Sequence, residues 1–485
     1  MIGQILLSRF QAYKNQPAIV LHHEVVDYQS LASWSIALAH HFRDKCGLKP
    51  GDCLAAQIPN NAAYPALFTG LSLLGVGLLP LHLHWKPEEV ARNLPGKPLA
   101  GIITPTSQMT AWAASPSFSS LPQMAFETLL TLKNEACISQ ADELLYTDFS
   151  QQEALYLMTS GTTGQPKLVV RTQANLLANS HHVARALAWK PGCRVLPVTP
   201  FSHANGFSNG MLLPMLSGAC LFLLPQLFPA RLAELVLRHR IEVMIASPFV
   251  YSTLLNHGLS PAETGSLLYA LSSGAPLPES LAREAAAQWG VPLRNLYGAS
   301  ETGTISIESP QNQDGRTTAG APLESVEIRI LSEAHEPLPV EQAGLIAVRS
   351  PAVMKGYWTT SGIDPARNAA GFYLTGDRGF LDRQGNLNIL GRGRPFLNIG
   401  GNKVSVQEIE EVLRRLPGVA RCCVRGMEHL QLNQVIHASI WPEPGIQLQQ
   451  NDVLAFCRLH LAEYKIPRQI SIEPCSESGL SAKSY

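Results

Sequence analysis

The sequence lacks an excess of charge of either sign. Its 485 residues include 37 Lys plus Arg and 37 Asp plus Glu, so the formal net charge is zero with histidine neutral. This balance removes any global electrostatic reason to expect a nucleic acid or an anionic membrane as a partner. Charged residues are also scarce, at 15% against 46% hydrophobic residues, and no polar low-complexity tract occurs. The composition is that of a folded protein with a large core.

Paired cysteines are missing as well. The nine cysteines form no C-x-x-C motif and have no regular spacing. Their odd number and scatter argue against a disulfide framework or a zinc site, and fit free thiols in a reducing cytoplasm. Residues 1–10 are too short and too soon charged for a signal peptide, and they predict a first amphipathic helix. We therefore expect a cytoplasmic protein.

Uninterrupted hydrophobic runs are also absent. Residues 62–81 and 211–230 carry no charge over about twenty residues, and so reach the length that a bilayer demands. Both are punctuated by proline and glycine, which would interrupt a spanning helix. Each stretch instead predicts a buried helix, a turn and a core strand. We expect no membrane span.

Helical and strand patterns alternate along the first three hundred residues, without an internal repeat. Helical periodicity is found at 31–42, 231–240 and 279–289, and strand patterns at 53–58 and 243–246. Strands that alternate with helices of about ten residues indicate parallel sheets covered by helices.

The pattern changes after about residue 315. Residues 326–330 and 344–349 alternate with the two-residue period of half-exposed strands, and 382–386 predict a hairpin turn into a strand at 387–390. The last ninety residues predict a small α+β domain with helices at 405–416 and 452–461. We therefore predict a large domain at 1–393 and a small one at 394–485. Glu408 and Glu410 are expected to be exposed acids in the first helical turn.

A loop rich in glycine and threonine is the most informative segment. Thr159-Ser-Gly-Thr-Thr-Gly-Gln-Pro-Lys167 follows an apolar strand at 154–158 and precedes a helix that begins near Thr172. Its glycines permit a tight turn, while free N–H groups, hydroxyls and a lysine offer a nest for phosphate oxygens. The G-x-x-x-x-G-K-[ST] phosphate loop does not fit, because Pro166 directly precedes the lysine. The alternative is a plain surface loop. The predicted phosphate-binding residues are Thr159, Ser160, Gly161, Thr162, Thr163, Gly164 and Lys167.

This segment resembles the phosphate-binding signature of the adenylate-forming superfamily, which includes acyl-CoA synthetases, adenylation domains of peptide synthetases and luciferases. The family form usually has glycine after the lysine, where this chain has Leu168. The resemblance implies an α/β fold with a large N-terminal domain of helix-covered sheets and a small β-barrel-like subdomain. A small, mobile α+β C-terminal domain would follow.

Further motifs occur in the family's order. Asn295-Leu-Tyr-Gly-Ala-Ser-Glu301 is similar to N-x-Y-G-x-T-E, and Ser273-Gly-Ala-Pro276 to the loop that contacts adenine through its backbone. The resemblance implies that Tyr297 stacks on adenine, that Ser300 meets the α-phosphate, and that Glu301 binds Mg²⁺. The implied nucleotide-binding residues of these two motifs are Asn295, Tyr297, Gly298, Ser300, Gly274, Ala275 and Pro276.

The nucleotide motifs continue towards the C-terminus. Tyr373-Leu-Thr-Gly-Asp377 matches Y-x-T-G-D, whose aspartate accepts hydrogen bonds from the ribose hydroxyls. Gly391-Arg392 matches the G-R whose arginine reaches the nucleotide; the alternative is a linker charge. Arg394 occupies the hinge position, where the family normally has aspartate or lysine.

The acceptor and the catalytic lysine are implied by the last two motifs. Phe396-Leu-Asn-Ile-Gly-Gly-Asn-Lys403 resembles the loop that approaches the active site for thioester formation, which singles out Gly400, Gly401 and Lys403. Counting without gaps from Lys465-Ile-Pro-Arg468 brings the family's catalytic lysine to Lys483. The alternatives are that Lys483 is only a tail residue or that this protein has lost the lysine.

The resemblance implies attack of a carboxylate on the α-phosphorus of ATP, with catalysis by Lys483, Glu301, His203 and Arg394. Pro200-Phe-Ser-His-Ala-Asn-Gly206 resembles the P-x-x-H-x-x-G of acyl- and aryl-CoA synthetases, in which the histidine gates the carboxylate pocket; the alternative is a core histidine. Amino-acid-activating relatives usually place an aspartate here, and none is found. A fatty or aromatic acid is therefore favoured. The expected cofactors are ATP, Mg²⁺ and coenzyme A or the pantetheine of an acyl or peptidyl carrier protein. A relative that forms no thioester remains the alternative.

Overall fold

The computed structural model describes residues 1–94, 96–134, 144, 147–159, 167–224, 229–259, 264–309, 318–392, 396–429, 433–443 and 446–473. Their internal contacts separate two compact units. Unit 1 contains the described residues of Met1–Leu83, Leu94–Thr159 and Lys167–Gly393, and unit 2 those of His84–Asn93 and Arg394–Tyr485. The predicted domain boundary at 393 and 394 lies outside the described residues and stays a prediction.

Unit 1 contains a nine-stranded sheet. From β13 to β1 its strands are parallel, and β2, β14 and β15 extend it by antiparallel pairing. The order is β15 (Ala321–Pro322), β14 (Gly303–Ile307), β13 (Leu293–Ala299), β12 (Tyr269–Ser272), β11 (Val243–Ala246), β9 (Arg194–Pro197), β10 (Cys220–Leu223), β1 (Pro17–Leu21) and β2 (Glu24–Asp27). Because both faces of a parallel sheet are covered by helices, its strands read as short continuous apolar runs such as Val243–Ala246.

A second sheet of unit 1 has eight strands. Its order is β19 (Gly362–Asp364), β18 (Gly356–Thr359), β8 (Lys167–Thr172), β7 (Glu153–Thr159), β4 (Gly77–Pro80), β3 (Cys53–Ala56), β5 (Gly101–Thr104) and β6 (Gln123–Ala125). The strands from β7 to β6 are parallel, whereas β8, β18 and β19 are antiparallel to their neighbours. The parallel strands β3, β4 and β5 are buried, and the antiparallel group carries part of the candidate site.

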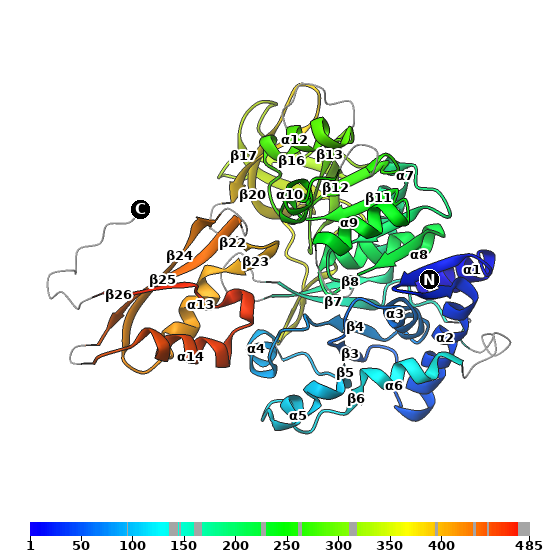
Figure 1. Ribbon diagram of the computed structural model, residues 1–485, viewed down its shortest axis with the longest axis horizontal. Coiled ribbons are helices and arrows are strands. Elements are labelled where there is room, and N and C mark those ends of the chain that lie inside the picture. Colours follow the sequence, from blue (N-terminus) through cyan, green and yellow to red (C-terminus); the bar gives the residue numbers. More distant parts are fainter. Residues whose placement is uncertain are drawn as a thin grey trace. The chain divides into compact units, whose positions relative to one another are not determined.

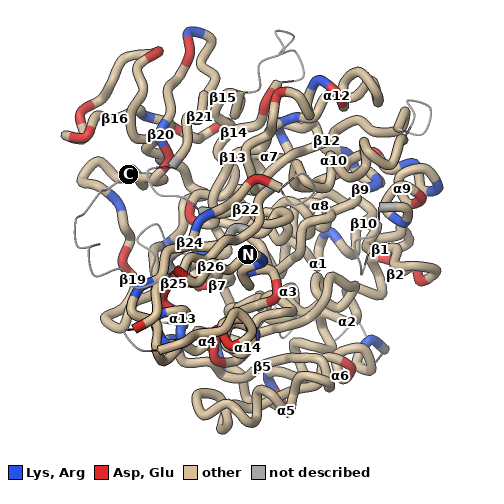
Figure 2. The backbone as a smooth tube through the Cα atoms, turned by 60° about the vertical axis from the view of Figure 1, so that its left-hand side comes forward, with Lys and Arg blue, Asp and Glu red and all other residues tan. Residues whose placement is uncertain are grey.

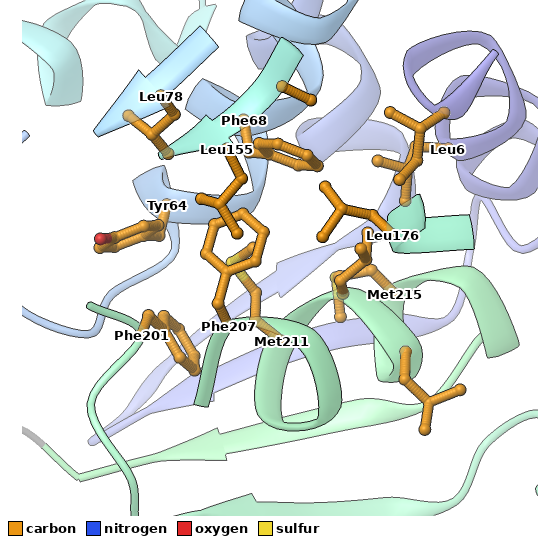
Figure 3. Close-up of a cluster of buried hydrophobic side chains, with 14 of the residues drawn as sticks. Leu6, Tyr64, Phe68, Leu78, Leu155, Leu176, Phe201, Phe207, Met211 and Met215 are labelled. Atoms are coloured by element: carbon orange, nitrogen blue, oxygen red, sulfur yellow. The ribbon is translucent and has the colours of Figure 1, made fainter. Parts of the chain in front are cut away.

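The main core of unit 1 lies where helices meet these sheets (Figure 3). Side chains from α1 (Ile2–Ala12), α3 (Ala63–Leu73) and the π-helix η5 (Gly206–Leu212) gather there with others from β4, β7, α7 (Gln173–Leu187) and α8 (Leu213–Ser217). Phe68 meets Phe207 edge to face at a ring separation of 4.8 Å, as aromatic quadrupoles favour. Both proline-punctuated stretches fold as predicted, with α3 leading to β4 and with η5 and α8 leading to β10.

The remaining helices of unit 1 also follow the sequence pattern. Tyr28–His40 forms α2, Pro229–Arg238 forms α9 and Glu279–Trp289 forms α12. The other helices are α5 (Thr106–Ala114), α6 (Phe126–Thr131) and α10 (Pro248–Asn256). No helix among the described residues is both long enough and apolar enough to cross a bilayer. Acidic and basic residues are interspersed along the backbone (Figure 2).

A third sheet of unit 1 is antiparallel throughout. It has the order β16 (Glu327–Leu331), β17 (Gly344–Arg349), β20 (Tyr373–Leu381) and β21 (Leu387–Arg392), so the two-residue alternation of the sequence is confirmed. The turn at 382–386 joins β20 to β21 as predicted. The mixed α/β class that the resemblance implied is confirmed.

Unit 2 is built on a five-stranded sheet (Figure 1). The path β23 (Asn402–Ser405), β22 (Phe396–Ile399), β25 (Asn433–Pro442) and β24 (Val419–His429) is completed by β26 (Gln469–Ile472), which pairs with β25. Helices α13 (Val406–Leu413) and α14 (Gln450–His460) contact each other and contribute to an apolar core of this unit. Helix α4 (Pro87–Asn93) belongs to the same unit, although it is distant in sequence.

The expectation for Glu408 and Glu410 was wrong. Glu408 is buried and forms an ion pair with Lys465 at 2.8 Å, and Lys465 forms a second ion pair with Glu89 of α4. Glu410 accepts a hydrogen bond from the Val424 N–H at 2.9 Å. Burial acts to lower the pKa of Lys465, but the two carboxylates outweigh it and raise that pKa, whereas burial raises the pKa of Glu89. Local sequence does not reveal partners this far along the chain.

Candidate functional site

Three of the predicted site segments lie at one edge of the nine-stranded sheet. Strands β9, β11, β12 and β13 are parallel neighbours, so their carboxyl ends share that edge. His203 follows β9, Gly274 to Pro276 follow β12, and Glu301 follows β13. Open α/β sheets bind ligands beyond the carboxyl ends of their strands, so this edge is the candidate site.

Two glycines of the predicted site have local reasons to be glycine. Gly274 has φ of +86°, in the left-handed region that side chains with a Cβ avoid. A Cβ at Gly298 would lie 2.3 Å from the carbonyl oxygen of Gly303, across the β13–β14 pair. The turn that carries Ser300 and Glu301 therefore closes more tightly than any other residue would allow.

The structure brings Tyr297 and Asp377 together. The Tyr297 hydroxyl donates to Oδ2 of Asp377 at 2.7 Å, and Asp377 is 6% exposed. The Asp377 N–H donates to Oγ1 of Thr375, which fixes the backbone at the aspartate. Arg392 lies opposite Asp377 in the β20–β21 pair, and its side chain is outside the described residues. The aromatic and acidic residues predicted to contact adenosine are thus adjacent.

Glu301 and Lys167 both contact Tyr357, a residue that the sequence motifs did not indicate. The hydroxyl of Tyr357, in β18, donates to Oε1 of Glu301 at 3.0 Å and lies 2.8 Å from the hydroxyl of Tyr373. The Lys167 ammonium lies 4.5 Å from the centre of the Tyr357 ring, within cation–π range. No motif signalled Tyr357, because its partners come from three other strands or turns.

Arg171 is a second residue that was missed. It is fully buried in β8, where its Nη2 donates to the carbonyl oxygens of Ala352 and Asn175. Burial lowers the pKa of Arg171 to about 10, against the opposing pull of Glu301. A charged residue inside the apolar run Leu168-Val-Val-Arg171 was the available signal. A buried cation therefore lies in the electrostatic neighbourhood of Glu301.

The predicted phosphate loop has a different setting from the one expected. Lys167–Thr172 form strand β8, which pairs antiparallel with β7, so residues 160–166 join two strands rather than a strand and a helix. Helix α7 begins at Gln173, one residue after Thr172, as predicted. Oγ1 of Thr159 donates to the Lys167 carbonyl oxygen at 3.3 Å across the base of the connection. Ser160, Gly161, Thr162, Thr163 and Gly164 lie outside the described residues.

His203 lies beside a second histidine, His82, and follows β9 at the same sheet edge. Its ring is 5.7 Å from that of His82, edge to face, and its carbonyl oxygen accepts from the Phe207 N–H. Burial lowers the pKa of His203 to about 4, so the imidazole is uncharged at neutral pH. Phe201 and Phe207 beside it are fully buried (Figure 3). A neutral histidine beside aromatic side chains fits the gate of an apolar pocket.

A buried amide network was also missed. Nδ2 of Asn205 donates to Oγ of Ser273 at 2.6 Å, which links the segment after β9 to that after β12. Nδ2 of Asn209 donates to Oδ1 of Asn205 and to Oγ1 of Thr304, and Oδ1 of Asn179 accepts from the Thr304 N–H. These bonds hold the π-helix η5 against the loop containing Gly274. Asn205 and Ser273 stood inside predicted motifs, whereas Asn179, Asn209 and Thr304 did not.

The other residues predicted to bind the nucleotide differ in hydrogen bonding and accessibility. Asn295 donates through Nδ2 to the Thr318 carbonyl oxygen, and its N–H donates to Oε2 of Glu308. Ala275 and Ser300 are partly buried and Pro276 is exposed. The structure therefore leaves these three accessible at the sheet edge and holds Asn295 in the β13 framework.

Unit 2 carries the predicted acceptor loop, and the loop is a hairpin. Ile399 pairs with Asn402, so Gly400 and Gly401 are the two turn residues between β22 and β23. Their φ angles of +58° and +90° lie in the left-handed region that favours glycine, which explains why both turn positions are glycine. The Lys403 side chain, Arg394 and Lys483 lie outside the described residues, so their roles remain predictions.

The donor set around Glu301 fits a magnesium ion that is shared with a nucleotide. Within the described ranges, no three His, Cys, Asp or Glu side chains form a group that could hold a metal on their own. Mg²⁺ is usually held by one or two carboxylates together with substrate phosphates and water. Glu301 offers one carboxylate, with Lys167 nearby through Tyr357. This arrangement suits a cation that arrives with ATP.

Comparison with known proteins gives a coherent result. The family described as AMP-binding enzyme matches residues 7–358, and the AMP-binding enzyme C-terminal domain matches residues 408–474. Medium-chain fatty-acid–CoA ligase of Escherichia coli is 29% identical over 91% of this chain and 80% of its own length. Feruloyl-CoA synthase of an Amycolatopsis species is 27% identical over 93% and 91%.

A solved structure gives the same fold. The o-succinylbenzoate CoA synthetase of Bacillus subtilis superposes with a TM-score of 0.85 at 24% identity, covering 97% of this chain and 94% of its own. The large domain of sheets and helices and the small C-terminal domain of that architecture are both found in this chain.

Proposed function

Since the chain belongs to the AMP-binding enzyme family, which is a family of acid–thiol ligases, we propose that it activates a fatty or aromatic acid with ATP and passes the acyl group to coenzyme A. The observation that carries this proposal is the adjacency of Tyr297 with Asp377 and of Glu301 with Lys167 through Tyr357. These pairs supply surfaces for adenosine, a divalent cation and phosphate within one unit.

In the first step, a carboxylate oxygen of the acid attacks the α-phosphorus of ATP. The bond to the bridging oxygen breaks, and pyrophosphate leaves. Tyr297 and Asp377 hold adenosine, Ser300 faces the α-phosphate, and Thr159 to Lys167 hold the departing pyrophosphate. Glu301 would hold Mg²⁺, which supplies charge neutralisation when it is bound. No protein nucleophile is needed, so the protein's contribution is positioning and charge stabilisation.

In the second step, the acceptor thiolate attacks the acyl carbonyl carbon and AMP leaves. We assign the acceptor approach to the hairpin at Gly400 and Gly401, the hinge to Arg394, and the first-step lysine to Lys483. The buried side chains of Phe201 and Phe207, which flank neutral His203 in sequence, support an acid with an apolar tail, because burying a charge without a partner is costly. The fatty-acid and feruloyl specificities of two relatives support the same class.

A single experiment tests substrate, acceptor and activity. The protein is incubated with ATP, Mg²⁺ and a panel of fatty, aromatic and amino acids, with and without coenzyme A, and products are identified by mass. We expect acyl-CoA and AMP from a fatty or aromatic acid, and acyl-adenylate when coenzyme A is omitted. Strongest ATP–pyrophosphate exchange with an amino acid would contradict the proposed acid. Acyl-adenylate that loads only a carrier protein would replace coenzyme A as the acceptor.

A matched pair of variants controls this experiment. Asp377→Asn removes the charge next to Tyr297 and should weaken ATP binding about tenfold or more, because hydrogen bonds to a charged acceptor contribute roughly 1.5–3 kcal/mol. Asp364→Asn makes the same change at an exposed position of β19 and should leave the kinetics unchanged. Equal effects in the two variants would remove Asp377 from the site.

A further inference from the structure

Tyr357 contacts two residues of the predicted site, Lys167 and Glu301, and also Tyr373 of the Y-x-T-G-D motif. Its strand, β18, lies beside β8, and Tyr357 pairs with Val169 there. Its side chain is 7% exposed and meets Lys167 from β8, Glu301 from the turn after β13, and Tyr373 from β20. One buried ring therefore connects three segments that are distant in sequence.

The direction of the hydrogen bonds follows from their chemistry. An ionised carboxylate has no proton to donate, so the Tyr357 hydroxyl must donate to Oε1 of Glu301. Because that proton is then used, the Tyr373 hydroxyl must donate to the Tyr357 oxygen across 2.8 Å. The chain therefore runs from Tyr373 through Tyr357 to Glu301, and each bond polarises the next.

The rest of the Tyr357 environment keeps this arrangement fixed. The Met354 N–H donates to the Glu301 carbonyl oxygen at 2.7 Å, and the Lys355 N–H donates to that of Val170. The segment leading into β18 thus holds the backbone of Glu301 while Tyr357 holds its carboxylate.

We propose that Tyr357 is a positioning residue for divalent-cation binding. Its hydroxyl engages Oε1 of Glu301, which would leave Oε2 to bind the cation. Its ring would place the Lys167 ammonium beside the phosphates of the nucleotide that binds with the cation. This inference rests on the proposed function, in which Glu301 is the magnesium ligand. Residues that orient a metal ligand typically contribute about 10- to 100-fold to metal affinity. Because Tyr357 contacts the residues assigned to the cation and the phosphates, we expect its effect on nucleotide binding.

The test measures ATP binding to the whole protein by calorimetry, at a series of Mg²⁺ concentrations and in excess chelator. Tyr357→Phe removes one oxygen and keeps the ring under Lys167. We expect about a 10- to 100-fold rise in the Mg²⁺ concentration that half-saturates the gain in ATP affinity. The affinity for ATP in chelator should match that of the wild type. Tyr357→Leu, which also removes the ring, should weaken ATP binding in chelator as well.

Tyr373→Phe is the matched variant, because it loses the same atom one hydrogen bond further from Glu301. It should shift the Mg²⁺ requirement in the same direction by a smaller factor. If Tyr357→Phe does not fold, as judged by its thermal unfolding, Tyr373→Phe decides alone, and an unchanged Mg²⁺ requirement overturns the inference. A Tyr357→Phe protein that loses ATP affinity equally with and without Mg²⁺ also overturns it.

Glu301→Gln separates this inference from the function on which it rests. A wild-type protein that binds no ATP, or a Glu301→Gln variant with a normal Mg²⁺ requirement, would overturn the assignment of Glu301 and the role of Tyr357 together. Magnesium-dependent binding that is lost in Glu301→Gln but unchanged in Tyr357→Phe would overturn the role of Tyr357 alone.

Discussion

At the scale of single residues, His203 shows how surroundings set chemistry. Burial lowers the pKa of His203 to about 4, from an ordinary value near 6.5. A neutral imidazole cannot attract the carboxylate of an acid by charge, so His203 acts through shape and hydrogen bonding. The sequence motif located this residue, but only the packing of neighbouring segments determines its protonation state.

The depressed pKa of His203 makes stability depend on pH. Below its unfolded pKa near 6.5, the unfolded chain binds a proton that the folded protein refuses, so stability falls as the pH drops towards 4. At roughly 1.4 kcal/mol for each pKa unit, we expect the wild type to lose about 2 kcal/mol at pH 5 relative to pH 7.5 through this group. His203→Gln should lose less over the same range, measured by thermal unfolding at both pH values.

His257→Gln, at an exposed position of the same unit, is the control for this comparison. It should retain the wild-type pH dependence. A His203→Gln protein whose unfolding midpoint falls with acid as steeply as that of the wild type would show that His203 titrates normally.

The sequence motifs locate candidate site residues along the chain, but they do not indicate which side chains contact one another. Tyr297, Glu301 and Asp377 stand in motifs whose spacing fixes their place after a strand or within one. Tyr357 and Arg171 were not predicted, because their contacts come from segments that are distant in sequence. Glu408 was misjudged because its ion-pair partner, Lys465, is distant in sequence.

At the scale of elements, the connection after β7 is the main correction. Its lysine starts β8, a strand that the sequence pattern did not predict before the helix near Thr172, and β8 lies between β7 and β18. Leu168, which stands where the family usually has glycine, pairs with Met158 on one side and Trp358 on the other and is fully buried. The departure from the motif therefore adds a core side chain directly beside Lys167.

Leu168→Ala should destabilise the protein by about 2–5 kcal/mol, the usual cost of removing a fully buried leucine side chain. Denaturant unfolding monitored by fluorescence measures this loss. Leu130→Ala, at a position that is 44% exposed, should change stability by no more than about 0.5 kcal/mol. A near-neutral Leu168→Ala would mean that the side chain does not support β8.

At the scale of the whole molecule, measuring the two half-reactions separately tests the role assigned to Lys483. Lys483→Ala should abolish adenylate formation but leave thioester formation from supplied acyl-adenylate, because the lysine is assigned only to charge developing at the α-phosphate. Pyrophosphate exchange and acyl-CoA formation from the synthetic adenylate measure the two steps. Lys49→Ala, at an exposed lysine, should preserve both. Loss of both steps in Lys483→Ala would contradict the assignment.

The α/β class and many helices and strands could be predicted from hydrophobic periodicity, because burial of one face imposes that periodicity locally. The grouping of helix α4 with the second unit was not, because no local pattern in Pro87–Asn93 indicates partners more than three hundred residues away. There, Arg92 donates to the His460 carbonyl oxygen and Trp85 donates to the Tyr464 hydroxyl. Contacts between residues this far apart in sequence cannot be inferred from local sequence patterns.

The Glu89–Lys465–Glu408 cluster has a consequence for protein engineering. A C-terminal fragment excised at residue 394, or a chimera that exchanges only the residues after it, would separate Lys465 from Glu89. Removing one partner of a buried ion cluster commonly costs about 3–5 kcal/mol. The exchangeable module is therefore discontinuous: a functional graft of the C-terminal unit should carry residues 84–93 along with it, or replace them with those of the same donor.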